Sequence, residues 1–180
     1  MKDSSSNPLP SHFRFKTGIR FGIITSLINS LIGIALYSFG LVDFSGNSGG
    51  WISFLLIGLG IYLASEHYKK FSGGYMRQSD VVVTALWLGL ISGIITVVFL
   101  LLQLQLDPSI LEKMQNLMEF QLEQQNLEGT EYDKAMEIGS MFMKPWVLAV
   151  MTLISSLFMT LIVGFLLSFF LRKEQESPFS

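Results

Sequence analysis

The chain of 180 residues contains no cysteine, so disulfide bonds and thiolate metal sites are excluded. Charged residues are also scarce: they make up 14% of the sequence, against about 25% in an average globular protein. The net charge of -2 is too small to indicate a nucleic-acid partner. Half of the residues are hydrophobic and the mean hydropathy is +0.49. This balance predicts a protein whose main partner is the lipid bilayer.

The stretch from Trp146 to Leu171 has no ionisable side chain, and Leu, Ile, Val and Phe fill sixteen of its positions. As a helix it would be roughly 39 Å long, which exceeds the ~30 Å hydrocarbon core of a bilayer. Its apolar residues favour insertion by roughly 5–8 kcal/mol. We therefore expect this stretch to span a membrane.

Three earlier apolar runs complete a set of four predicted spans, at residues 19–42, 51–68, 81–106 and 146–171. The first run is too long for a signal peptide, whose core has about 7–15 residues. The turn-rich residues 43–50 are short enough to force the first two spans into an antiparallel hairpin. The sequence thus predicts an all-α integral membrane protein with a bundle of four transmembrane helices. Residues 17–173 would form one membrane domain, between flexible tails at 1–16 and 174–180.

Lysine and arginine are unevenly distributed between the loops. Nine lie in the N-terminal segment, the loop between spans two and three, and the C-terminus, whereas three lie in segment 107–144. Because basic loops stay in the cytoplasm, both termini are predicted to be cytoplasmic and segment 107–144 to be outside.

The outer segment, 107–144, contains two helix starts. Asp107 followed by Pro108 is typical of an N-cap with proline at the first helical position. Thr130 with Asp133 resembles a capping box. The segment is therefore predicted to form an extracytoplasmic hairpin of two amphipathic helices, which either folds over the outer ends of the spans or docks a partner protein. Its acidic character argues against binding to anionic lipid.

Small residues recur at every fourth position within the spans, a pattern that lets helix backbones approach closely in a membrane. The residues expected to pack the helices are Gly18, Gly22, Ser26, Ser30, Gly89, Gly93, Ser156, Thr160 and Gly164. Either these faces meet inside the bundle, or one faces outward and binds a second copy or another membrane protein. The string GxxxGIIT occurs at 18–25 and at 89–96, which leaves a parallel repeat of two hairpins open.

Few polar side chains within the spans could carry chemistry. Asn29 lies mid-span, where it could hydrogen-bond to a neighbouring helix or bind a polar solute. The span cores hold no Asp, Glu, Lys, Arg or His, which counts against a proton-coupled pump. Glu66 and His67 are adjacent at the cytoplasmic edge but lack the further partners that a metal or acid–base site needs. We expect no catalytic residue, no metal ligand, no cofactor and no enzymatic activity.

The order of these features resembles a known family. Ile61–Lys70 reads IYLASEHYKK and is followed by GGY at 73–75; a glycine-containing third span ends in Asp107-Pro108, and an acidic, methionine-rich segment precedes the fourth. Over residues 15–173 this order resembles the bacterial membrane family called domain of unknown function 4199, found mainly in Bacteroidota. The resemblance implies an inner-membrane protein with four spans. It supplies no activity, cofactor or catalytic residue.

Two functions follow as hypotheses. The first is a non-enzymatic accessory or scaffolding subunit of the cell envelope, motivated by the small-residue faces and the acidic outer segment. The alternative is a small lipid or solute carrier, motivated by Asn29 and by the repeated string. The carrier hypothesis requires a polar cavity that reaches mid-membrane near Asn29, whereas a dry and closed core at that place would exclude it.

Overall fold

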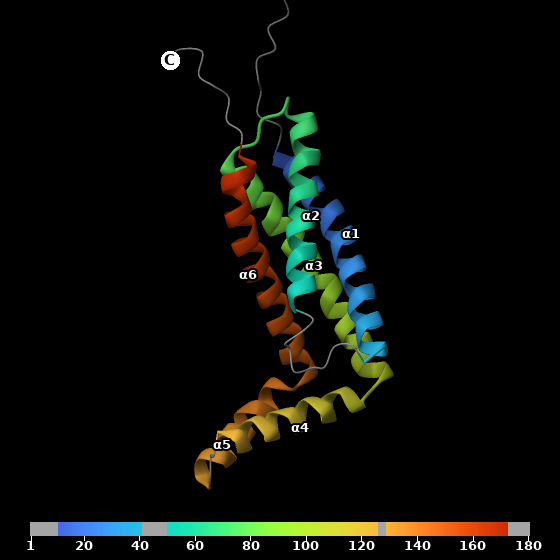
Figure 1. The fold of residues 1–180 in the computed structure, drawn as a ribbon, viewed down its shortest axis with the longest axis vertical. Helices are drawn as coiled ribbons and strands as arrows, with labels where there is room; N and C mark the ends of the chain where they lie inside the picture. The colour runs from blue at the N-terminus through green and yellow to red at the C-terminus, as the bar shows by residue number, and fades with distance from the viewer. Residues whose placement is uncertain (1–10, 41–49, 126–128, 173–180) are drawn as a thin grey trace, which may run out of the picture.

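The computed structural model describes residues 11–40, 50–125 and 129–172. Within these ranges the chain forms six helices and no strand (Figure 1). The helices are α1 (Ser11–Ser38), α2 (Gly50–Phe71), α3 (Gln78–Leu106), α4 (Ser109–Gln124), α5 (Thr130–Phe142) and α6 (Pro145–Leu171). The predicted all-α fold is confirmed for this part of the chain.

Four of the helices, α1, α2, α3 and α6, are long and apolar enough to cross a membrane. They lie side by side, with α1 beginning and α6 ending at one end of the bundle and with α4 and α5 at the other (Figure 1). Helix α3 lies between α1 and α6 and packs most extensively against these two, while α2 contacts α1 and α6. Large apolar side chains such as Leu55, Phe158 and Phe170 are exposed on the outside of the bundle, as expected for surfaces that face lipid.

The tightly packed apolar core lies toward the end of the bundle where α2 connects to α3. It contains Ile61, Ala64 and Tyr68 of α2, Val81, Ala85 and Leu88 of α3, and Val163 and Leu171 of α6, together with Met76 from the connection. Because the largest buried side chains gather at this end, the opposite half of the bundle is left with less apolar filling.

The beginning of α1 differs from the sequence prediction. Residues 11–16 were expected to belong to a flexible tail, but they form the first turns of α1. Two contacts explain the difference. The Phe13 ring lies 5.2 Å from that of Phe71, centroid to centroid, and the Arg14 guanidinium pairs with the Asp80 carboxylate at 2.9 Å. The helix is therefore anchored to α2 and α3 before its apolar run begins. The remaining tail residues, 1–10 and 173–180, and most of the predicted turn at 43–50 lie outside the described residues.

Helices α4 and α5 form an antiparallel hairpin, called here the crosswise hairpin (residues 109–124 and 130–142). Its helices pack closely where Gly139 lies against the Met118 side chain. The predicted capping box at Thr130 is not formed: Gly129, with a φ of 62°, is the N-cap, and its carbonyl accepts the backbone N–H of Asp133. Figure 1 shows α4 crossing the end of the bundle and then projecting past α6. The hairpin therefore covers the span ends only in part.

Candidate functional site: a polar pocket between the spans

The small residues of α1 lie against α3. A methyl group built on Gly18 would lie 2.6 Å from Cβ of Trp87 and 2.9 Å from the carbonyl oxygen of Thr84. A methyl group on Gly22 would lie 2.9 Å from the carbonyl oxygen of Leu88. Ser26 is fully buried one turn further along, and its hydroxyl donates to the carbonyl of Gly22 at 2.7 Å. The backbones of α1 and α3 thus approach each other very closely. Such an approach is possible only where one of the two helices carries glycine or another small residue.

The small residues of α3 lie against α6 in the same way. The Gly89 surface contacts the Thr160 side chain, and Gly93 lies next to Ser156. The Ser156 hydroxyl donates to the Gly89 carbonyl at 3.2 Å, which ties the two helices together. Gly164 lies next to Ala85. These faces therefore lie inside the bundle. The two copies of GxxxGIIT pack against different partners, α3 and α6, so their packing lends no support to a repeat.

Toward the crosswise hairpin this close packing gives way to a pocket of about 280 Å³. All four spans contribute to its wall. The lining residues are Asn29, Ser30, Gly33, Ile34 and Tyr37 of α1, Ser53 of α2, Thr96, Phe99, Leu100 and Gln103 of α3, and Thr152 of α6. Asn29 makes no side-chain hydrogen bond to another helix within the described residues. The structure instead places it on the wall of this pocket.

The pocket lining combines polar groups with apolar wall and carries no carboxylate, ammonium, guanidinium or imidazole group. Amides, aliphatic hydroxyls and one phenol provide both donors and acceptors. The hydroxyl oxygen of Ser30 is buried and has no hydrogen-bond partner. Ser65 and Thr84, in the tightly packed half of the bundle, have partnerless buried hydroxyl oxygens as well, so this feature is not particular to the pocket.

Glycine at position 33 keeps one wall of the pocket open. A Cβ added to Gly33 would meet no atom within 4 Å, whereas one added to Gly18, Gly22 or Gly89 would collide with a neighbouring helix. The same residue type therefore has two roles along the membrane: it allows close packing in one half of the bundle and leaves space in the other.

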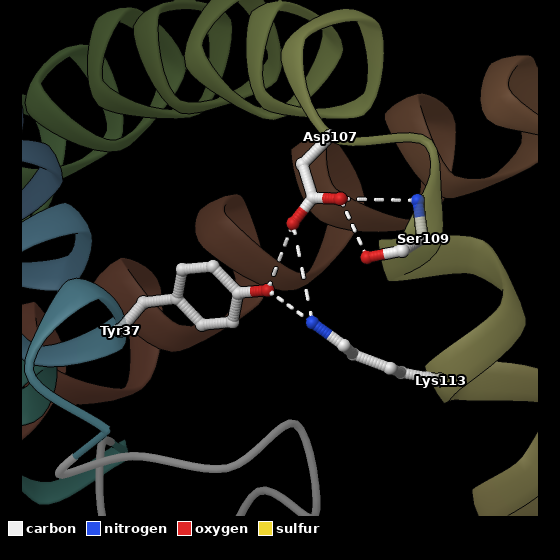
Figure 2. A network of polar contacts seen from close by, with 4 residues as sticks. All are labelled: Tyr37, Asp107, Ser109 and Lys113. Atoms are coloured by element: carbon white, nitrogen blue, oxygen red, sulfur yellow. Dashed lines mark hydrogen bonds and ion pairs between the residues drawn. The ribbon is translucent and has the colours of Figure 1, made fainter.

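A network of four side chains lies where Tyr37 leaves the pocket wall (Figure 2). The Tyr37 hydroxyl donates to Oδ2 of Asp107 at 3.2 Å and accepts a hydrogen bond from Nζ of Lys113 at 3.0 Å. Oδ1 of Asp107 accepts the backbone N–H of Ser109 at 3.1 Å and its hydroxyl at 2.5 Å. The N-cap of α4 is therefore Pro108 and not Asp107 as predicted, although the Asp107 carboxylate accepts the Ser109 backbone N–H in the first turn; Tyr37 links that turn to α1.

The same contacts shift two pKa values. The hydroxyl of Ser109, followed by that of Tyr37, stabilises the ionised carboxylate and holds the pKa of Asp107 below its usual value. The hydrogen bond to Tyr37 raises the pKa of Lys113. With Lys113 and Asp107 4.0 Å apart, their opposite charges compensate each other, so the network is electrically neutral near pH 7.

Sequence reasoning singled out Asn29 as a polar site but assigned Ser30 to helix packing and missed most of the pocket. The missed polar residues are Tyr37, Ser53, Thr96, Gln103 and Thr152. A signal was present, because Ser30 and Tyr37 are seven residues apart, as are Thr96 and Gln103, and this spacing returns to the same helix face after two turns. The sequence does not show that these two faces point at each other.

At the opposite end of the bundle, Glu66 and His67 have structural contacts. Glu66 pairs with Lys69 at 2.9 Å, and the ring of His67 lies among those of Phe13, Phe21 and Phe71. No cluster of His, Asp or Glu in the described part of the chain could hold a metal ion.

An all-helical bundle with four helices of membrane-spanning length and composition defines a multi-pass membrane protein. The family model described as "Protein of unknown function (DUF4199)" matches residues 20–173, and the chain belongs to this family. The resemblance stated from the sequence is thereby confirmed. Neither a curated protein nor a solved structure matches the chain.

Proposed function

We propose that this protein binds a small uncharged polar solute in the pocket between its four spans and carries it within the membrane. The observation that supports the proposal is the pocket of about 280 Å³ at Asn29, lined by all four spans. A cavity beside Asn29 with polar groups in its wall is the feature that the carrier hypothesis calls for, and it is what supports the proposal.

The chemistry of the lining supports an uncharged solute. An ion would lose its hydration in the pocket without meeting an opposite charge, and such a loss costs far more than the burial of a neutral polar group. The nearby charges of Asp107 and Lys113 compensate each other. Asn29 and Gln103 can each donate and accept through their amides, and Phe99 and Leu100 provide apolar wall. Compounds with several hydroxyl or amide groups fit this combination.

Filling the pocket tests the proposal. Gly33→Leu is expected to lower solute flux to the level of protein-free vesicles, because position 33 lines the pocket and a Cβ there meets no atom within 4 Å, which leaves room for a side chain that fills it. The measurement is stopped-flow light scattering of proteoliposomes challenged with glycerol or urea. The matched control is Ala35→Leu, which adds its bulk on an exposed face of the same helix, two residues away. Its flux should equal that of the wild type.

Two results would contradict the proposal. Wild-type vesicles that respond no faster than protein-free vesicles to either solute would exclude carriage of small neutral compounds. Equal flux through the wild type and Gly33→Leu would mean that the solute takes another route.

A scaffolding role is a second proposal, and the observation in its favour is that the crosswise hairpin projects past the bundle. The small-residue faces support it less, because they are occupied by contacts within the bundle. Purification in mild detergent should then co-isolate another protein in a fixed ratio. Isolation of this chain without such a partner would speak against the role.

The proposed location is the inner membrane of a bacterium, with both termini in the cytoplasm. The distribution of basic residues supports this orientation, since Arg14, Lys69 and Arg77 belong to the end of the bundle opposite the crosswise hairpin. The cysteine-free chain allows a direct test. An impermeant maleimide should label Gln124→Cys in intact cells, whereas Ser72→Cys should react only after lysis. The reverse pattern would invert the topology.

A further inference from the structure

The crosswise hairpin leaves the bundle at the level where the spans end. Leu106, the last residue of α3, has 85% of its surface exposed, and Trp146, near the start of α6, has 66% exposed. Exposed Trp side chains at the ends of spans are typical of the boundary between lipid and water. Helix α4 begins three residues after α3 ends and runs across the spans (Figure 1). A hairpin that starts at this level and runs in this direction lies along the membrane surface.

One face of α4 is oriented by its contact with the bundle. Lys113 reaches Tyr37 of α1, so the side of α4 that carries Lys113 is turned toward the bundle and the membrane plane. Phe120 follows Lys113 by seven residues, which is two helical turns, and therefore projects from nearly the same side about 10 Å further along. At that point α4 is leaving the bundle. The exposed ring of Phe120 thus points to where lipid surrounds the protein.

Helix α5 has an apolar face that α4 does not cover. Tyr132, Ala135, Met136 and Gly139 of α5 and Met143 directly after it are half-buried, and Gly139 marks the face that contacts α4. Ile138, Met141 and Phe142 are exposed and share a separate face, with the spacing i, i+3 and i+4. Ser140 lies on the opposite, polar side. The exposed apolar face occupies the half of α5 that is closest to the bundle.

We infer that the crosswise hairpin rests on the surface of the bilayer around the bundle, with Phe120 and the Ile138–Phe142 face inserted among lipids. The exposed face of α5 ends at Phe142, four residues before the exposed Trp146 of α6, so the two apolar surfaces end and begin close together along the chain. The helices α4 and α5 carry six acidic and two basic residues, which excludes electrostatic attraction to anionic headgroups. The contact is therefore hydrophobic, and its lipid is zwitterionic or neutral.

The test uses single cysteines, each carrying an environment-sensitive nitrobenzoxadiazole label, in proteoliposomes of phosphatidylcholine. Phe120→Cys and Ile138→Cys probe the two predicted lipid faces. Gln115→Cys and Ser140→Cys are matched controls, because both positions are exposed and lie on the far sides of the same two helices. The quencher is a phosphatidylcholine that carries a nitroxide near its headgroup, and iodide serves as the aqueous quencher.

The lipid quencher should reduce emission severalfold more at positions 120 and 138 than at positions 115 and 140, and iodide should give the opposite order. Lipid quenching that is equal at all four positions, or that fails at either position 120 or 138, overturns the inference. If the hairpin instead needed a partner protein to cover it, iodide would quench the labels at all four positions in these vesicles and the lipid quencher would not. Solute flux does not enter this measurement, so its result is independent of the carrier proposal.

Discussion

Gly89→Ala should destabilise the bundle by about 1–3 kcal/mol, the usual cost of an added methyl group in a packed core. The new Cβ would lie 2.8 Å from Cβ of Thr160 and would overlap its hydroxyl, so α3 and α6 would have to separate. The separation would also stretch the hydrogen bond from Ser156 to the Gly89 carbonyl. The measurement is the free energy of unfolding by sodium dodecyl sulfate in mixed micelles.

Two further variants isolate the cause. Gly58→Ala is the matched control, since its Cβ would meet only Cγ1 of Val163, at an ordinary 3.9 Å. It should leave stability unchanged or raise it slightly, because alanine favours helix. Thr160→Gly in the Gly89→Ala background should restore part of the lost stability, because the glycine on α6 then makes room for the new methyl group on α3. Equal stabilities for Gly58→Ala and Gly89→Ala would mean that this contact is looser than described.

Asp80→Asn should destabilise the protein by about 1–3 kcal/mol, because it leaves the Arg14 guanidinium without its counter-charge. The pair is 2.9 Å apart, and the two side chains are only 27% and 15% exposed, so water compensates for the loss in part. Nε of Arg14 is buried and already lacks a partner. Asparagine keeps an oxygen that can accept the Arg77 backbone N–H, so the start of α3 is preserved. The same micelle unfolding assay measures the effect.

A double-mutant cycle with Arg14→Gln gives the coupling energy of this pair, expected to be about 1 kcal/mol or more. The pair Glu66–Lys69, which lies within the single helix α2 and joins no two helices, provides the comparison at the same end of the bundle. Glu66→Gln should change stability by about 0.5 kcal/mol or less, as is usual for a pair three residues apart on one helix. If both substitutions had the same small effect, the contact between α1 and α3 would not depend on charge.

The four spans were predictable because insertion depends on the length and composition of a single segment, and residues 146–171 satisfy both requirements alone. The early start of α1 was not predictable, because Phe13 and Arg14 are held by residues from other helices. The small residues identified the packing faces in the same local way, from each segment by itself. Which helix each face meets depends on the arrangement of all four spans. For that reason Gly33 could not be distinguished from Gly18 by sequence, although one borders space and the other a backbone.

The central place of α3 sets the order of events during synthesis. Asp80, the partner of Arg14, is made 66 residues later, and Ser156 follows its acceptor Gly89 by 67 residues. At translation rates of about 5–20 residues per second, each gap lasts roughly 3–13 s. During the first gap the glycine face of α1 has not yet been covered by α3. During the second gap the glycine face of α3 has not yet been covered by α6. This protein therefore has two successive intervals during synthesis in which it needs insertion machinery that shields nascent helices.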